Sequence, residues 1–439
     1  MPNVKFKLQS KFLFDAVWNY GAFAAMAATG MFLNLFIAAF YGVEALGIFN
    51  QIYVVYIISS QFAVLGFHDS AQKYVSELDM EPEHLGVVSL AALVLAAGFG
   101  LLVAFAIYFL ADPIGILFES EPVGSGIALA APGLMFIAIN KVLMGVLNGM
   151  RMMKHFAGAQ ALRAVAILLC CVGIMLFEYP PYMLGLGFTI AEIVLLPLLL
   201  YFVHPHLTNF SSFEAFKRWV RVHFHFGSRA LINGLLIQSY IRIDVIMLGI
   251  FVGDHDVGIY TFAAMFVDGL FQIPIIFRTL ANPELVRFFK SGEKLATAQF
   301  CRSVGAVSLG VFGVVAAIVL FIYPYLGPYF PDDLVNLSYP LLLVLSGGLI
   351  LYAVMIPVDM IVLQAGMPGR QSLLMTFNVL VNVALNLALI PLYGLYGAAV
   401  ATAIAFAIAS IAINGATWKW LGFKGGVLLY GTPLVREPQ

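Results

Sequence analysis

Charge is what this sequence has least of. Only 10% of its 439 residues are Asp, Glu, Lys or Arg, whereas a soluble domain carries roughly 25%. Hydrophobic residues make up 62% of the chain, which is more apolar surface than the interior of one globule can hold. The shortage of charge therefore argues against an ordinary soluble protein and indicates a chain whose solvent is lipid.

Cysteine is equally scarce, and groupings that carry catalysis are missing. Cys170 and Cys171 are adjacent in an apolar run and Cys301 stands alone, so the spacing of a metal or redox site is lacking. The sequence has no Gly-rich phosphate loop, no Ser/His/Asp grouping and no Cys/His cluster. We expect no enzyme, no cofactor, no metal site and no nucleic-acid partner.

Long apolar runs are what the chain does have. A helix that crosses a bilayer needs about 20 apolar residues, and Gly and Pro are tolerated within it. Tyr393 and Gly394 alone divide the last two runs. The pattern predicts an all-α integral membrane protein with twelve transmembrane helices, at about 16–40, 46–67, 87–110, 126–149, 158–177, 183–203, 227–251, 257–280, 300–323, 337–361, 371–391 and 395–415.

The positions of the basic residues predict the orientation of these spans. With the N-terminus inside the cell, every Lys and Arg lies in an inner segment or within or at the edge of a span. The outer loops carry acids instead, among them Glu44, Asp112 and Asp332. An excess of Lys and Arg marks cytoplasmic loops. We therefore expect a multi-pass protein of the cell's inner (plasma) membrane with both termini in the cytoplasm.

The chain also repeats itself. The pattern Gly42-x4-Gly47 matches Gly253-x4-Gly258 at an offset of 211 residues, with Phe, Tyr or Ile on both sides. The same offset carries Pro113 onto Pro324, and Gly149-Met150 matches Gly366-Met367 at an offset of 217. Chance similarity of Gly-rich apolar segments is the alternative. A repeat predicts two pseudo-symmetric six-helix bundles with the same orientation, and such repeats place a substrate site between the halves.

These patterns divide the chain into a bundle at 1–203, a cytoplasmic linker at 204–226, and a second bundle with a cytoplasmic tail at 227–439. Ser211 and Glu214 form a capping-box signal for a helix in the linker. One face of that helix is apolar and the other is basic, which suits a helix on the membrane surface. A solvated basic linker is the other interpretation. The apolar face comprises Phe213, Phe216, Trp219 and Val220, and the basic one Lys217, Arg218 and Arg221.

The most unusual stretch runs from Arg229 to Arg278, because it holds charges inside two apolar runs. By helix rise, Arg242 lies ~12 Å and Asp268 ~16 Å below the outer ends of their spans. Asp244 points to a different face from Arg242, whereas Gln238 shares the Arg242 face. Intramembrane charges mark substrate or ion paths. We expect a cavity-lining cluster that binds an anionic group or a proton, and a structural ion pair is the alternative.

The first half holds a parallel case. Lys141 lies ~13 Å from the inner end of its span, and Glu192, at mid-depth in the sixth span, is its candidate partner. Glu192, like Asp244 and Asp268, is a candidate for ion coupling or for an ion pair. Asn34, Gln61 and Tyr53 are candidates for a polar and aromatic cavity wall, with simple packing as the alternative. Snorkelling to the inner interface suffices to explain three further arginines near span ends, and Asp359 receives little weight. Those arginines are Arg163, Arg229 and Arg278.

Four segments then carry a resemblance to a known family. They are residues 42–77, which end in FNQIYVVYIISSQFAVLGFHDSAQKYVSE, residues 131–151 (APGLMFIAINKVLMGVLNGMR), residues 241–266 (IRIDVIMLGIFVGDHDVGIYTFAAMF) and residues 389–405 (LIPLYGLYGAAVATAIA). The chain resembles, over nearly its whole length, the oligosaccharide and polysaccharide repeat-unit flippases of the multidrug/oligosaccharidyl-lipid/polysaccharide exporter superfamily. Each motif is soft, but their order and the six-plus-six layout add specificity.

The resemblance implies two six-helix bundles around a central cavity, alternating access, and a cargo of polyprenyl-pyrophosphate-linked oligosaccharide for cell-surface polysaccharide biosynthesis. It implies that Arg242 and Lys141 bind the pyrophosphate, and that Asp244 occupies the family's acidic position in span 7. Membrane lipids, polysaccharide polymerases and glycosyltransferases are the expected partners. The alternative is an exporter of amphipathic cations from the same superfamily, which would need a cavity dominated by acids and aromatics.

Overall fold

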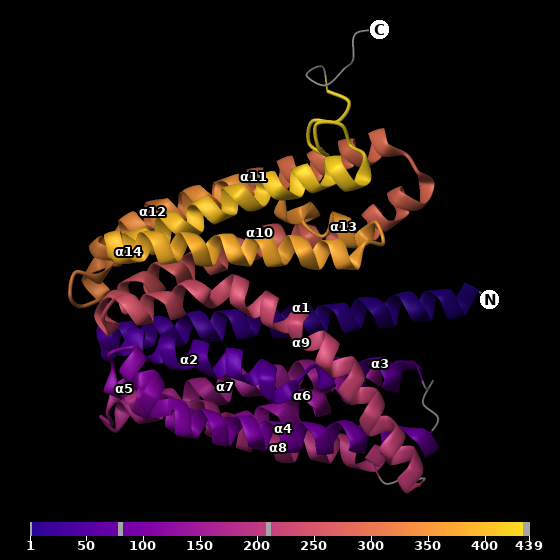
Figure 1. Cartoon of the computed structure of the whole chain (residues 1–439), viewed down its shortest axis with the longest axis horizontal. Coiled ribbons are helices and arrows are strands. Elements are labelled where there is room, and N and C mark those ends of the chain that lie inside the picture. Colours follow the sequence, from indigo (N-terminus) through magenta and orange to yellow (C-terminus); the bar gives the residue numbers. More distant parts are fainter. Residues whose placement is uncertain (1, 78–81, 208–211, 433–439) are drawn as a thin grey trace. The chain divides into compact units, whose positions relative to one another are not determined.

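The residues described in this computed structural model, 2–77, 82–207 and 212–432, form helices joined by short turns, with no β-strand among them (Figure 1). In chain order the α-helices are α1 (Pro2–Phe40), α2 (Val43–Val64), α3 (Phe67–Glu77), α4 (Pro82–Leu117), α5 (Glu121–Ala130), α6 (Gly133–Gly149), α7 (Met153–Leu176), α8 (Leu186–Leu207), α9 (Phe213–Phe251), α10 (Asp254–Ser291), α11 (Lys294–Ile322), α12 (Leu334–Ala353), α13 (Ile361–Gln364) and α14 (Pro368–Leu421). Three short 3-10 helices lie between them, at η1 (Pro181–Gly185), η2 (Tyr323–Tyr329) and η3 (Ile356–Val358).

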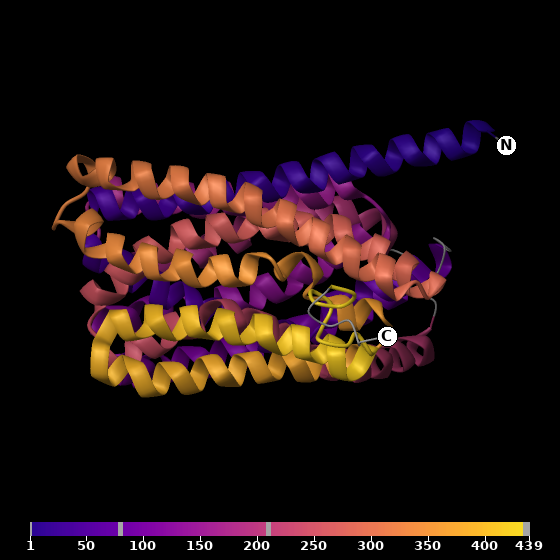
Figure 2. The ribbon, with the colours of Figure 1, turned by 90° about the horizontal axis from the view of Figure 1, so that it is seen from above.

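The chain divides into two compact units, Met1–Gln238 (unit 1) and Ser239–Gln439 (unit 2). Within each unit the long helices run side by side (Figures 1 and 2). The division falls inside α9, later than the expected start of a second bundle at residue 227. The reason is that the first part of α9 packs on unit 1 instead of forming a separate linker.

Most of the long helices are apolar enough to cross a membrane. In the part of the chain that the structure describes, eight helices meet this condition singly, and the bent pair α5–α6, with 46° between its parts, brings the number to nine. On α4, Phe105 and Phe109 are 57% and 72% exposed, although their helix is among the most apolar. Exposed aromatics on an apolar helix indicate a lipid-facing surface. Each of the twelve expected spans overlaps a helix, and their number as membrane crossings stays a prediction.

The final two expected spans both belong to α14. Gly394 has φ 55° and ψ −133°, which is non-helical, and it interrupts α14 where the sequence predicted a boundary. A Cβ added at Gly397 would lie 2.2 Å from the carbonyl oxygen of Leu389. In a continuous helix these residues would be ~12 Å apart along the axis. The chain therefore reverses at Gly394, and α14 consists of two helices packed against each other.

The internal repeat appears at matching structural positions. Gly42 is the N-cap of α2, and Gly253 is the N-cap of α10. Gly149 ends α6 just before α7, and Gly366 follows α13 just before α14. Both matched motifs thus lie at junctions between consecutive helices in unit 1 and in unit 2, and the pseudo-symmetry of the two halves stays a prediction.

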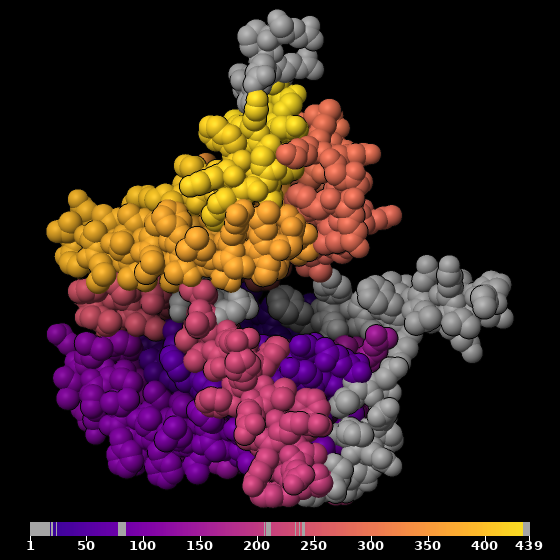
Figure 3. Space-filling model, turned by 45° about the vertical axis from the view of Figure 1, so that its right-hand side comes forward, coloured from indigo at the N-terminus to yellow at the C-terminus, as the bar shows by residue number. Residues whose placement is uncertain are grey.

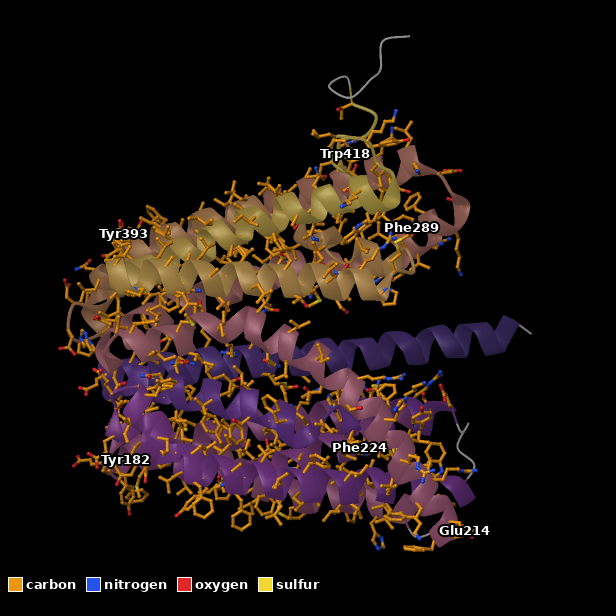
Figure 4. All side chains as sticks on the ribbon, in the orientation of Figure 1. Tyr182, Glu214, Phe224, Phe289, Tyr393 and Trp418 are labelled. Carbon is orange, nitrogen blue, oxygen red and sulfur yellow. The ribbon has the colours of Figure 1, made fainter. Side chains whose placement is uncertain are left out.

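The first part of α9 lies across unit 1 (Figure 3, pink). Ser211 lies outside the described residues, and the helix is capped by Ser212, whose Oγ accepts a hydrogen bond from the Ala215 amide at 3.1 Å. The Trp219 ring packs edge-on against Tyr74 of α3, with centroids 5.2 Å apart. Figure 4 labels Glu214 at one end of unit 1 and Phe224 further along α9. The first part of α9 is thus docked on protein, and its position at the membrane surface or as a solvated linker stays a prediction.

His223 fastens α9 to two other helices. Its Nδ1 lies 2.7 Å from the Ser70 hydroxyl of α3, and its Nε2 lies 3.1 Å from the Val88 carbonyl oxygen of α4. The carbonyl can only accept, so Nε2 carries the proton and Ser70 donates to Nδ1. Burial lowers the pKa of His223 to about 4, against a smaller opposing effect of the Val88 hydrogen bond. The ring is therefore a neutral connector at physiological pH.

Candidate functional site

In unit 1, the buried carboxylate of Glu192 on α8 is the centre of a polar cluster. Its Oε1 pairs with Arg163 of α7 at 2.9 Å, and its Oε2 accepts a hydrogen bond from Asn140 of α6 at 2.7 Å. The same amide of Asn140 donates to the Glu192 backbone oxygen at 2.8 Å. The Glu192 side chain is 2% exposed and that of Arg163 16%. Arg163 therefore does not merely snorkel, as expected, but neutralises a buried acid and ties α7 to α8.

Lys141 is the neighbouring cation, and it does not pair with Glu192. Its Nζ donates to the hydroxyl of Ser60 on α2 at 3.3 Å, and within the described residues no carboxylate oxygen is within 4 Å of it. The charge of Lys141 also acts on His68, which lies just beyond the second expected span. The pKa of His68 is lowered to about 4, chiefly by burial and also by the Lys141 charge, while the Asp69 carboxylate acts in the opposite direction. The hydroxyl is neutral, and the carboxylates of Glu192 and Asp69 act on the Lys141 ammonium only from beyond ion-pair distance, so Lys141 keeps a capacity to attract an anion.

The three candidate wall residues of unit 1 all have partners in the structure. Asn34 of α1 accepts a hydrogen bond from Asn50 of α2 at 2.9 Å. Tyr53 stacks on Phe188 of α8, with ring centroids 5.6 Å apart. Gln61 is 8% exposed and donates to the Ser60 hydroxyl at 3.4 Å. These contacts fit the packing interpretation of these residues, and a role in lining a cavity stays a prediction.

In unit 2, the charges of α9 face those of α10. Asp244 accepts a hydrogen bond from the Val245 amide at 3.0 Å and another from the hydroxyl of Tyr260, a fully buried side chain of α10. Arg242 is half-buried and interacts electrostatically with both Asp244 and Asp268. Asp268 is exposed. The three charges expected to cluster are thus brought together, and hydrogen bonds hold Asp244 in place.

Gln238, expected on the Arg242 face, is half-buried and is the last residue of unit 1. On the backbone of α9 it precedes Arg242 by one helical turn. Its assignment as a substrate-contacting residue stays a prediction.

One ion pair escaped the sequence analysis. Arg278 of α10 pairs with Asp359, between η3 and α13, at 3.1 Å, and Tyr352 adds a hydrogen bond to the same oxygen at 3.4 Å. Gln371 of α14 donates to the Asp359 backbone oxygen at 3.1 Å. Snorkelling is therefore wrong for Arg278, and Asp359 holds α10, α12 and α14 together. A signal was present, because both residues lie two positions from the predicted inner ends of their spans, hence at equal depth.

In the described part of the chain, no group of three or more His, Cys, Asp or Glu side chains is placed to hold a metal ion. Cys171 and Cys301 are buried and Cys170 is half-buried, and all three are free thiols. The charged groups within the spans are suited to binding and to holding helices together.

Sequence comparison decides the family. The sequence model described as "Polysaccharide biosynthesis protein" matches residues 17–279, which is more than half of the chain and includes both charged clusters. The chain belongs to the polysaccharide biosynthesis protein family. This confirms the polysaccharide branch named in the resemblance.

A curated relative gives a partial match. The chain is 25% identical over 191 residues to the probable low-salt glycan biosynthesis flippase Agl15 of Haloferax volcanii. The aligned part covers 43% of this chain and 40% of the relative, so this chain spans less than half of the relative's length.

Solved structures confirm the fold. An inward closed structure of the lipid II flippase MurJ matches with a TM-score of 0.72 at 15% identity, over 92% of this chain and 87% of that one. An inward-facing structure of a multidrug resistance MATE family transporter of the MOP superfamily matches with 0.71 at 16% identity, over 93% and 96%. The polysaccharide biosynthesis protein is therefore an all-α multi-pass membrane protein that shares the fold of these structures.

Proposed function

We propose that this polysaccharide biosynthesis protein is a flippase that moves a lipid-linked oligosaccharide across the cell's inner membrane. The observation that carries the proposal is the family match over residues 17–279, on a chain whose fold resembles solved flippases and exporters. The partial likeness to a glycan biosynthesis flippase supports the same substrate class.

The charges within the spans supply the recognition chemistry. A pyrophosphate is a multivalent anion, and cations with donor hydrogens bind it through charge-assisted hydrogen bonds. Lys141 in unit 1 bonds to a neutral hydroxyl, and Arg242 in unit 2 is half-buried within an apolar helix. We assign both to the pyrophosphate, with Asp244 and Asp268 as candidates for ion coupling. Both termini face the cytoplasm in this proposal, and alternating access moves the cargo outward.

A deletion strain tests the function. We expect loss of the protein to trap lipid-linked glycan on the cytoplasmic leaflet and to stop surface-glycan assembly. The wild-type gene restores assembly, whereas Arg242→Ala at an equal membrane level does not. Arg287→Ala is the matched control, because Arg287 is exposed and pairs with Glu284 of its own helix at 2.9 Å. Normal surface glycan with Arg242→Ala would remove that residue from the mechanism.

Export of amphipathic cations is the second candidate, and the likeness to a MATE structure over 93% of this chain favours it. The same strain separates the two functions. Ethidium accumulation in the deletion strain, together with unchanged surface glycan, supports the exporter and contradicts the flippase. Polysaccharide polymerases and glycosyltransferases are proposed partners of the flippase only.

A further inference from the structure

A groove between α3 and the first part of α9 lies entirely within unit 1 and outside the charged clusters described above. It has about 550 Å³ of room, which is within the ~300–1,000 Å³ usual for small-molecule sites. Lys73 and Tyr74 of α3 form one wall, and Val222, His225, Phe226, Arg229 and Ala230 of α9 form the other. Lys73 comes shortly after the inner end of the second expected span, and Arg229 lies near the inner end of the seventh expected span. We therefore place the groove at the inner membrane interface.

The groove gathers cations above an apolar floor. Lys73 is 46% exposed at its side chain, and its Nζ lies 4.8 Å from the Tyr74 ring centroid and 5.5 Å from that of Phe226. His225 and Arg229, four residues apart and so on one face of α9, are both exposed. The carboxylate at the groove's edge is Glu77, 3.8 Å from Lys73. Two permanent cations and a histidine over aromatic rings suit a ligand with a multivalent anionic head and an apolar tail.

Contacts next to the groove hold its two walls, α3 and the first part of α9, together. His223 joins α9 to α3 and α4, as described above, and Trp219 packs on Tyr74. A Cβ added at Gly66 would lie 2.7 Å from Ala230 and 3.2 Å from the Gly227 oxygen, so the two backbones touch. Glycine is required at Gly66 for a second reason, its φ of 70°. A site whose walls are fixed in this way loses little entropy when it binds.

We propose that this α3–α9 groove is a separate binding site for the diphosphate head of a polyprenyl lipid in the inner leaflet. A phospholipid headgroup carries a single phosphodiester charge, and a site with two permanent cations favours the more highly charged diphosphate. The biological role rests on the proposed flippase function, since the groove would capture cargo at the interface before translocation. The binding itself does not depend on transport.

The test measures binding of farnesyl diphosphate to the full-length protein in detergent. Trp219 reports locally when the other three tryptophans are replaced by phenylalanine, because its ring touches the groove residue Tyr74. We expect Lys73→Ala/Arg229→Ala to weaken binding about tenfold or more. The matched control is Lys217→Ala/Arg221→Ala, which removes one Lys and one Arg that are exposed and outside the groove. We expect the control to weaken binding by less than about threefold.

Each further result decides the matter. Equal weakening in both double variants would reduce the effect to general surface charge and overturn the site. Displacement of farnesyl diphosphate by equimolar phosphatidylglycerol would overturn the assignment to a diphosphate, whereas resistance to it supports the assignment. If Lys73→Ala/Arg229→Ala does not fold, Lys73→Gln alone must still weaken binding. If the deletion strain traps glycan but the protein does not bind farnesyl diphosphate, this site is refuted and the flippase function stands. If the protein binds farnesyl diphosphate but the deletion strain traps no glycan, the flippase function is refuted and the site stands.

Discussion

Replacement of Glu192 by leucine tests whether the buried ion pair of unit 1 is structural. The substitution removes the partner of Arg163 at 2.9 Å and also the acceptor of the Asn140 amide at 2.7 Å. Leucine has nearly the volume of glutamate, so cavity formation contributes little to the result. The Asn140 amide keeps its second acceptor, the Glu192 backbone oxygen, so the change chiefly isolates the cost of leaving the Arg163 cation without its partner.

The magnitude follows from burial. Removing one member of a buried ion pair costs about 3–5 kcal/mol, because the other charge stays buried without compensation. Arg163 is 16% exposed, so it can still reach some polar surroundings, and we expect the lower end, about 3 kcal/mol. This corresponds to about a hundredfold fall in the ratio of folded to unfolded protein. Arg163→Met leaves a carboxylate that is 2% exposed, so its cost is expected nearer the upper end.

The assay is thermal unfolding of the purified full-length protein in detergent, followed by size exclusion after heating. Both single variants are expected to unfold at clearly lower temperature than the wild type. The double variant Glu192→Leu/Arg163→Met removes both charges together, and we expect it to recover most of the loss.

Two results would refute this reasoning. If Glu192→Leu unfolds at the wild-type temperature but abolishes surface-glycan assembly, Glu192 belongs to the transport mechanism and the ion pair is not structural. If the double variant loses as much stability as the two single variants combined, the residues do not act as a pair.

Three further expectations follow. Lys141→Met should abolish surface-glycan assembly while costing only about 1 kcal/mol of stability, because its hydrogen-bond partner is the neutral Ser60 hydroxyl; a large loss of thermal stability would assign it to structure. Since the pKa of His223 in the folded protein is about 4, the unfolded state takes up its proton first, and stability should fall by up to about 3 kcal/mol as pH drops from about 6.5 to 4. Unfolding curves across that range should lose this component in His223→Leu and keep it in the exposed-site control His204→Leu. Gly397→Ala should lower the unfolding temperature, because its Cβ would lie 2.2 Å from the Leu389 oxygen, whereas Gly415→Ala, with nothing within 4 Å, should not.

Helix positions were the most predictable part of the fold. Apolar length alone located helices at every expected span, because in lipid each crossing segment must satisfy its own backbone hydrogen bonds. The reversal at Gly394 was also readable, since glycine accepts the positive φ that a sharp reversal needs. The repeat motifs at Gly42 and Gly253 marked helix starts, as both glycines are N-caps, although only Gly42 has a positive φ.

Charge partners were much less predictable. Helix rise set the depth of Glu192 but could not identify its partner, and Lys141 was the one expected. Packing of α7 against α8 selected Arg163 and left Lys141 with Ser60. The equal depth of Arg278 and Asp359 pointed to their pairing, yet depth alone matches many pairs in a bundle of this size.

The sequence by itself determined that this chain is an all-α membrane protein and where its helices begin and turn, because hydropathy and glycine positions act locally along the backbone. Only the tertiary structure decided which charges neutralise each other and that the first part of α9 docks on α3 and α4. An apolar helix face has the same sequence pattern whether lipid or protein covers it. The energy of a buried charge depends on the few ångströms to its partner, and that distance is set by helices that are far apart in the chain.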